Sequence, residues 1–144
     1  MPDISYTAAT HLDIGVLKGA RLDLEYGDTG NDFELTLDID SEQRLDDGAY
    51  VYVEGTEWGG VVDARESNSG NNTITYIGRS WQGILRDRVL EPPSGEDYLS
   101  VRGEAHEVLK QLVQRLGLTN QFKVSEDTSG ITVKHTFDRY CDAW

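Results

Sequence analysis

The sequence predicts an α+β fold, built mainly as an antiparallel β-sandwich or β-barrel with two helices packed on it. Short runs that alternate apolar and polar residues recur along the chain, which indicates about six or seven half-buried strands. Loops rich in Gly, Asn, Asp and Ser separate these runs, as in β-hairpins. Only two segments show helical spacing of apolar residues, and the longer one comes late in the chain. Strands followed by few helices are typical of α+β domains.

The N-terminal part predicts a weak strand and a hairpin. Weak patterning over residues 1–12 indicates a short edge strand or an arm. Ala20–Tyr26 and Asp32–Asp40 alternate strictly, so we expect two half-buried strands joined by the turn Gly27–Asn31. The weak strand depends on Ile4, Tyr6 and Leu12, and the residues expected to face inward in the hairpin are Leu22, Leu24, Tyr26, Phe33, Leu35, Leu37 and Ile39.

The middle of the chain predicts a third strand, a second hairpin and a short helix. Ala49–Glu54 is apolar on both faces, as in a central strand or one that faces a partner. Gly59–Arg65 and Thr73–Ile77 flank a polar loop, which predicts a hairpin. Ser80 can cap a helix that Pro92 and its neighbouring proline stop. Its apolar face would consist of Trp81 as a core anchor, Ile84, Leu85 and Val89.

The C-terminal part predicts the clearest helix and a last hairpin. Glu104–Leu116 follows helical spacing, and Gly117 suits a left-handed C-cap. Phe122–Ser125 and Ile131–Thr136 are expected to pair around a turn. Pro92–Val101 is expected to be a connection. The apolar helix residues are Ala105, Val108, Leu109, Leu112, Val113 and Leu116; Leu118 should fold back onto the last turn, and Tyr98 and Leu99 should hold the connection to the body.

Composition limits the classes of function. The chain has 26 acidic and 13 basic residues and a net charge of −13, which opposes nucleic-acid binding because that depends on basic side chains. A solvated acidic surface is the simpler interpretation, and a channel wall that DNA passes without sticking is the other. The single cysteine, Cys141, leaves no internal disulfide or Cys-based metal site, and we expect it to be a small hydrophobic contact. No apolar run approaches the roughly 20 residues of a membrane span, and the N-terminus lacks signal-peptide features.

Candidate catalytic groups are few. His11, His106 and His135 are far apart, and none has the spacing of an HExxH zinc site. His106 fits a surface histidine near a helix start. No GxSxG, Walker A or GxGxxG motif is present. The sequence therefore predicts that the chain is not an enzyme and has no catalytic, cofactor-binding or metal-binding residues.

Two sets of acidic residues can be interpreted either as a site or as a solvated surface. One set could hold Ca²⁺, but it lacks the order of an EF-hand loop, so a solvated loop explains it better. The other could supply the paired carboxylates of a glycosidase, but on alternating strands it is more simply the water-facing half of the pattern. The first set is Asp38, Asp40, Glu42, Asp46 and Asp47; the second is Asp13, Asp23, Glu25 and Glu34.

Two further groups have both a binding and a structural interpretation. Basic residues around Trp81 could form a basic-aromatic patch, but local ion pairs with the neighbouring acids explain them better. Trp58, Tyr50 and Tyr52 could form an aromatic platform of a carbohydrate- or ligand-binding β module, or belong to a core or subunit interface. The basic residues are Arg79, Arg86 and Arg88, and the acids are Asp87 and Glu91.

Several segments resemble one family. The runs GTEWGGVVD and ITYIGRSWQGILRDRVLEPPSGEDYLSVRGEA, the upstream LDLEYGDTGNDFELTL and, more loosely, ITVKHTFDRYCDAW are similar to the N-terminal part of the tail hub (baseplate hub) proteins of siphoviruses and prophages. The likeness lies in hydrophobic, Gly and aromatic positions and includes no catalytic signature. It implies a tail-tube-like β domain over residues 1–93, with residues 94–144 in the same domain or in the start of a second subdomain.

The resemblance also implies an assembly role. It predicts a virion structural protein of the phage tail that is made in the host cytoplasm. Proteins of this type are trimers with two tube-like domains per subunit, and they contact the tail tube, distal tail and tip proteins. From the charge and the lack of a long apolar run, we also expect no sequence-specific nucleic-acid binding and no membrane association. Because hub proteins are much longer, we expect the chain to be an N-terminal fragment of one.

Overall fold

A computed structural model describes residues 2–25, 32–138 and 141–142. The chain divides into two compact units, Met1–Ile84 and Leu85–Trp144. The division after residue 93 that the resemblance implies stays a prediction. The turn expected at Gly27–Asn31, the inward position of Tyr26 and the side chain of Cys141 lie outside the described residues.

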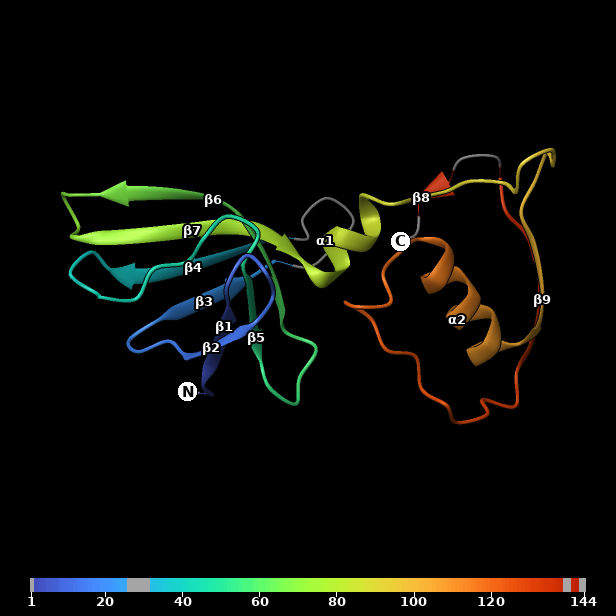
Figure 1. The fold of residues 1–144 in the computed structure, drawn as a ribbon, viewed down its shortest axis with the longest axis horizontal. Helices are drawn as coiled ribbons and strands as arrows, with labels where there is room; N and C mark the ends of the chain where they lie inside the picture. Colours follow the sequence, from blue (N-terminus) through green and yellow to red (C-terminus); the bar gives the residue numbers. More distant parts are fainter. Residues whose placement is uncertain (1, 26–31, 139–140, 143–144) are drawn as a thin grey trace. The chain divides into compact units, whose positions relative to one another are not determined.

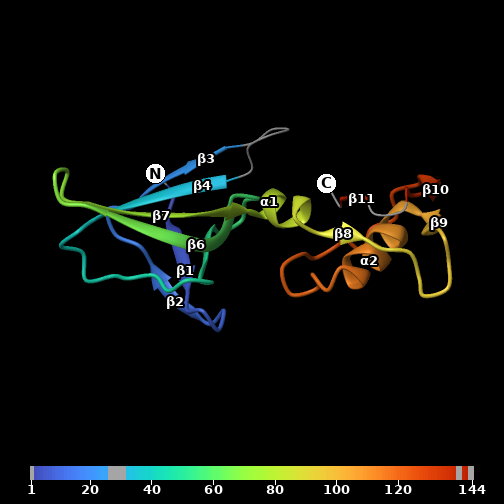
Figure 2. The ribbon, with the colours of Figure 1, turned by 90° about the horizontal axis from the view of Figure 1, so that it is seen from above.

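One antiparallel sheet makes up most of the first unit (Figures 1 and 2). Its two edge strands, β2 and β3, each have a single neighbour, so the sheet is open. The α+β prediction with a mainly antiparallel sheet is therefore confirmed, and the closed-barrel alternative is wrong. Alternation specifies a buried face, but it does not specify whether two edges meet. In spatial order the strands are β2 (Asp13–Val16), β1 (Ile4–Thr7), β5 (Tyr50–Val53), β6 (Gly59–Asn68), β7 (Thr73–Ser80), β4 (Asp32–Asp38) and β3 (Arg21–Leu24).

The sheet encloses one apolar core on its inner face. Phe33 lies against Gly60 and Gly78, where an added Cβ would come within 2.9 Å of its ring. The Tyr76 hydroxyl, also buried, accepts a hydrogen bond from the Leu45 backbone N–H at 3.3 Å. Strands from both ends of the sheet contribute to the same cluster, so the sheet bends around it. The buried members are Ile4, Tyr6, Leu17, Phe33, Leu35, Leu37, Leu45, Ala49, Val51, Val53, Val62, Ile74 and Tyr76.

The two predicted hairpins of this unit are confirmed. β3 pairs with β4, and Leu22 and Leu24 are half-buried against the core as expected. β6 pairs with β7 over a longer range than predicted, with a bulge at Asp63. The Asn68 side chain accepts hydrogen bonds from the backbone N–H groups of Gly70 and Asn71, which closes the tight turn. β5 is a central strand between β1 and β6, one of the two alternatives that its pattern left open.

The first strand is not an edge strand or an arm. β1 lies between β2 and β5, and Ile4, Tyr6 and Thr7 are buried. The edge position belongs to β2, which the sequence analysis did not predict, and Leu12 is 71% exposed. The pattern of β1 is weak because the buried Thr7 breaks the alternation and its hydroxyl accepts a hydrogen bond from the Tyr50 backbone N–H at 2.9 Å.

The short helix α1 (Trp81–Arg86) begins as predicted but ends early. The Ser80 hydroxyl accepts a hydrogen bond from the Gly83 backbone N–H at 3.3 Å, so Ser80 caps the helix. Val89, expected on the helix face, is 49% exposed and belongs to β8 (Val89–Leu90), which pairs with β11 (Cys141–Asp142). A pairing with residues distant in sequence therefore replaces the last predicted turn of the helix.

The second unit packs helix α2 (Ala105–Arg115) against a two-stranded sheet of β9 (Ser100–Glu104) and β10 (Thr132–Thr136). Gly117 has φ 70° and the buried Leu118 donates its N–H to the Val113 carbonyl, so the predicted C-cap is confirmed. The last hairpin is wrong: residues 122–125 form no strand, and β10 pairs with β9 instead. Leu99 is buried, but Tyr98 and Leu109 are 57% and 51% exposed, contrary to expectation.

Gly78→Ala tests the packing of Phe33. The added Cβ would lie 1.8 Å from the Val61 carbonyl oxygen, so backbone must move. We expect the free energy of unfolding to fall by roughly 2–3 kcal/mol. Urea denaturation measures this change. Gly70→Ala is the matched control, because its Cβ meets only the flexible Asn68 side chain at 3.2 Å. Equal stability of the two variants would contradict the account of the core.

Candidate functional site

The acidic residues considered as metal ligands do not gather. Among residues 2–25, 32–138 and 141–142, no group of three or more His, Cys, Asp or Glu side chains lies close enough to hold a metal ion. The first acidic set is exposed, and within it Asp40 accepts a hydrogen bond from the Asn72 side-chain amide at 3.2 Å. The arrangement is a hydrated loop surface.

The second acidic set is divided between the two edges of the sheet. Asp13 is on β2 and accepts a hydrogen bond from the Tyr52 hydroxyl at 2.8 Å, which raises the pKa of that hydroxyl. Asp23 is on β3, where it pairs with Arg21 at 2.9 Å and lies opposite Glu34 of β4. Asp13 and Asp23 are therefore not two carboxylates that flank one bond.

Of the basic residues near Trp81, Arg79 has a defined partner. Arg79 makes a two-pronged ion pair with Asp63, with its Nε and Nη2 each 2.8 Å from a carboxylate oxygen. The partner is thus the bulged residue of β6 and not one of the acids that follow the helix. The expected pairing of Arg86 and Arg88 stays a prediction. Because its charge is matched at close range, Arg79 is not available as an anion-binding group.

An aromatic cluster covers part of the outer face of the sheet. The rings of His11 and Tyr50 stack with centroids 3.7 Å apart and planes 9° apart. The rings of Trp81 and Tyr50 meet edge-on, with their centroids 5.3 Å apart. The Trp81 ring also fills the space that a Cβ on Gly59 would occupy. Trp81 is therefore half-buried on the outer face, not a core anchor. Because His11 covers one face of Tyr50, the platform proposed for Tyr50, Tyr52 and Trp58 is not an open strip of rings.

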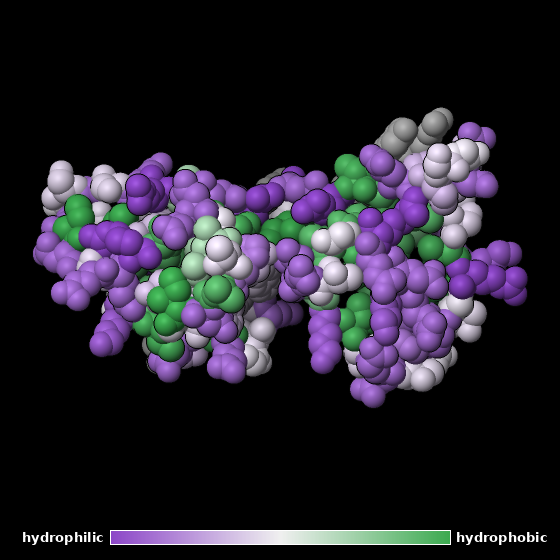
Figure 3. Space-filling view, viewed as in Figure 1, coloured by the Kyte–Doolittle hydropathy of each residue, from purple (hydrophilic) through white to green (hydrophobic). Residues whose placement is uncertain are grey.

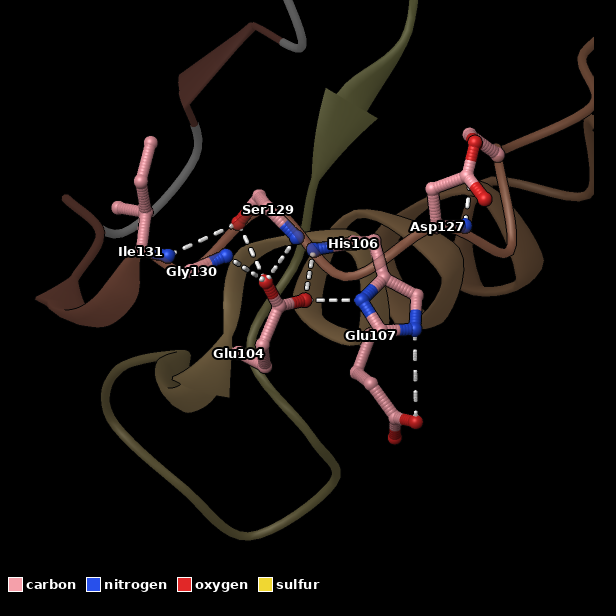
Figure 4. Close-up of polar contacts among 8 residues, drawn as sticks. Glu104, His106, Glu107, Asp127, Ser129, Gly130 and Ile131 are labelled. Carbon is pink, nitrogen blue, oxygen red and sulfur yellow. Dashed lines mark hydrogen bonds and ion pairs between the residues drawn. The ribbon is translucent and has the colours of Figure 1, made fainter.

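Several polar contacts gather around Glu104 and His106 in the second unit (Figure 4). One carboxylate oxygen of Glu104 accepts hydrogen bonds from the His106 backbone N–H at 2.8 Å and from the His106 ring. The other accepts from the Ser129 N–H at 2.6 Å, from the Ser129 hydroxyl and from the Gly130 N–H at 3.1 Å. Glu104 is thus the N-cap of α2 and also joins the loop before β10 to the helix.

Glu104, His106 and Ser129 together do not form a proton relay. The serine and the histidine both bond to the carboxylate, and neither is joined to the other as a nucleophile is to its base. The Ser129 hydroxyl, the main cause, and the N–H donors hold the pKa of Glu104 at about 2, below its ordinary 4.5. The His106 side chain is half-buried, with 16% of its surface exposed. The arrangement fastens a loop.

A further functional candidate is a run of exposed apolar residues on and just before edge strand β2. It consists of Leu12, Ile14 and Val16, which are 71%, 55% and 43% exposed and which we call the β2 apolar surface. Figure 3 shows apolar side chains over the part of the sheet where β1 and β2 lie. In a chain with a net charge of −13, apolar residues clustered on a sheet edge are typical of a contact surface for another chain.

The sequence pattern did not reveal β2, because the strand has only four residues and one of them is Gly15, a poor strand former. It also missed the role of Ser129, which no motif marks. Glu104, just before an apolar helix pattern, was placed in the helix, although a residue at that position can serve as a cap. Comparison of the chain with protein-family models, with curated proteins and with solved structures finds no match.

Glu104→Gln tests the loop attachment. Because the pKa of Glu104 is lower in the folded chain, its ionised carboxylate stabilises the fold above pH 4.5, and this contribution is lost as pH falls from about 4.5 to about 2. We therefore expect the variant to be less stable than the wild-type chain at neutral pH, with a deficit that shrinks over this interval. Thermal unfolding at several pH values measures it.

Hydrogen exchange gives a local readout of the same change. The Ser129 and Gly130 amides should exchange faster in the variant at neutral pH, since they lose a charged acceptor. Glu107→Gln is the matched control, because that side chain is 66% exposed and touches the site only at 3.7 Å from the His106 ring. A stability difference that does not change between neutral pH and pH 2 would contradict the assignment.

Proposed function

We propose that the chain is a structural protein of a bacteriophage or prophage tail, the N-terminal part of the distal hub that assembles with the tail tube and tip. In this role it acts by shape and surface complementarity and not as an enzyme. It would assemble with copies of itself, as a trimer in the full-length protein, and with neighbouring tail proteins. It would reside in the virion after assembly in the host cytoplasm.

The observation that carries the proposal is the place of the resembling segments in the fold. LDLEYGDTGNDFELTL covers most of β3 and of β4, GTEWGGVVD enters β6, and ITYIGRSWQGIL covers most of β7 and of α1. β6, β7, β4 and β3 are consecutive neighbours in the sheet. Segments that are separate in sequence but similar to one family thus form one continuous piece of structure, which supports a tail-tube-like β domain.

Two surface properties support an assembly role. The β2 apolar surface offers the kind of patch that subunit contacts bury. The outer positions of β3, β4 and β6 carry the carboxylates Asp23, Glu34, Asp38 and Glu66. An acidic sheet face repels a nucleic-acid backbone, which suits a channel that DNA crosses without sticking. The stacking of His11 on Tyr50 weakens the alternative of a carbohydrate- or ligand-binding module.

Immunogold labelling of tail particles tests the location. Antibodies against the chain should label the distal end of particles released from the bacterium that carries the gene. Antibodies against the major tube protein serve as the control and should label along the whole tail. Particles that lack the chain, or that carry it along the tube or at the head, would contradict the proposal.

A triple variant tests the contact surface. Leu12→Ser, Ile14→Ser and Val16→Ser together remove three exposed apolar side chains. If burial of each side chain contributes about 1 kcal/mol to association, the dissociation constant for self-assembly of the full-length protein should rise on the order of 100-fold. Light scattering coupled to size-exclusion chromatography measures this. The control exchanges Val89, Leu109 and Ile131, which are similarly exposed in the second unit, for serine. Unchanged assembly of the β2 variant would contradict the role of this surface.

A further inference from the structure

The two edges of the sheet differ in how their main-chain groups are satisfied. At β2, the Gln43 side chain donates to the Val16 carbonyl at 2.9 Å and accepts from the Lys18 N–H at 2.8 Å. This amide occupies the positions that an added strand would use. A register shift opposite Thr7 further interrupts β2. β2 is thus protected against main-chain pairing, as natural edge strands often are.

Edge strand β3 has no such protection among the described residues. It pairs with β4 without a register shift, and the Glu25 N–H extends the ladder to the Asp32 carbonyl at 2.9 Å. In an antiparallel ladder, alternate residues bond to the neighbouring strand. Because Glu25 and Asp32 form a bonded pair, Leu22 and Leu24 direct their main-chain groups away from β4. The open side of β3 therefore offers two N–H donors and two carbonyl acceptors.

The side chains beside this edge favour strand addition. Leu22 and Leu24 are half-buried and pack against the core, so a strand laid along β3 would cover their remaining apolar surface. The far half of β6 also lacks a second neighbouring strand in the described part of the chain, but its residues from Asp63 to Asn68 are exposed, and only Ala64 is apolar. A strand added there would bury little. β3 is the edge where new main-chain bonds and apolar burial coincide.

Charges beside β3 define the chemistry of the added segment. Four acidic residues line a hollow of about 250 Å³ at the end of β3, and Leu24 and Phe33 also line it. The acidic residues are Asp23, Glu25, Asp32 and Glu34. Arg21 is the one base of the strand, and it already pairs with Asp23. Residues of an added strand that lie opposite Asp23 and Glu25 would face acids, and cross-strand pairs of opposite charge are stabilising. A second copy of this acidic chain would bring further negative charge.

We propose that β3 is an acceptor edge for an extended segment of a different protein, in which apolar residues alternate with Lys or Arg. The apolar residues pair with Leu22 and Leu24 on the core side, and the basic residues face the carboxylates on the outer side. Main-chain hydrogen bonds supply the attachment, and the alternation supplies the selectivity. The inference depends on the edge itself and not on the phage assignment.

Binding of two fluorescent peptides to the whole chain tests the proposal. One alternates lysine and valine, and the other alternates glutamate and valine. The lysine peptide should bind at least roughly tenfold more tightly, from several cross-strand charge pairs of opposite sign. Leu24→Pro removes the N–H that points away from β4 and leaves the hydrogen bonds between β3 and β4 in place. Edge strands tolerate proline at such a position. The substitution should abolish peptide binding.

A charge-reversal variant provides a second test that does not depend on whether the proline variant folds. Asp23→Lys with Glu25→Lys changes two exposed side chains, and its binding should shift to the glutamate peptide. Sedimentation of the unliganded chain at the same concentration reports self-pairing. The proposal is overturned if Leu24→Pro binds like the wild-type chain, if charge reversal leaves the preference unchanged, or if a dimer forms that Leu24→Pro dissociates, since a second copy would then be the occupant.

Discussion

The close approach of Phe33 to the glycine positions of β6 and β7 is the constraint on which the first unit depends. At Gly60 and Gly78 the ring lies where any larger residue would place its Cβ, and the backbone oxygens of Arg79 and Val61 lie closer still. The ring can therefore rest directly on the main chain of two strands. The same core takes side chains from strands on both sides of this contact, while β2 and β3 remain the two edges of the sheet.

Much of this architecture was accessible from the sequence because alternation reports directly on one-sided burial. β3, β4, β5, β6 and β7 were located in this way, and the local preferences of Ser80 and Gly117 located the N-cap of α1 and the C-cap of α2. Long-range pairing was not accessible. Residues 122–125 and 131–136 look like two arms of a hairpin, yet the second arm bonds to β9. Nothing local distinguishes one partner from another of similar polarity.

The candidate sites show the same difference between local and long-range features. The sequence identifies acidic and aromatic residues by type, but whether they form a site depends on three-dimensional positions that sequence spacing does not encode. Asp13 and Asp23 alternate on equivalent strands, yet they lie on opposite edges. Gln43 sits in a polar loop with no motif, yet its amide replaces a strand at β2. Glu104 was expected to be the first residue of a helix, and it also holds the loop before β10 through hydrogen bonds from Ser129 and Gly130.

The far half of the β6–β7 hairpin has a consequence for how this protein can vary. From Asp63 to Asn68 every residue of β6 is exposed, and the turn that follows is closed by a local asparagine. Substitutions there alter no buried contact of β6, and added residues would only extend the hairpin. Divergence in length and composition should therefore concentrate at this tip, and a tag or epitope inserted between Ser69 and Gly70 would leave the core intact.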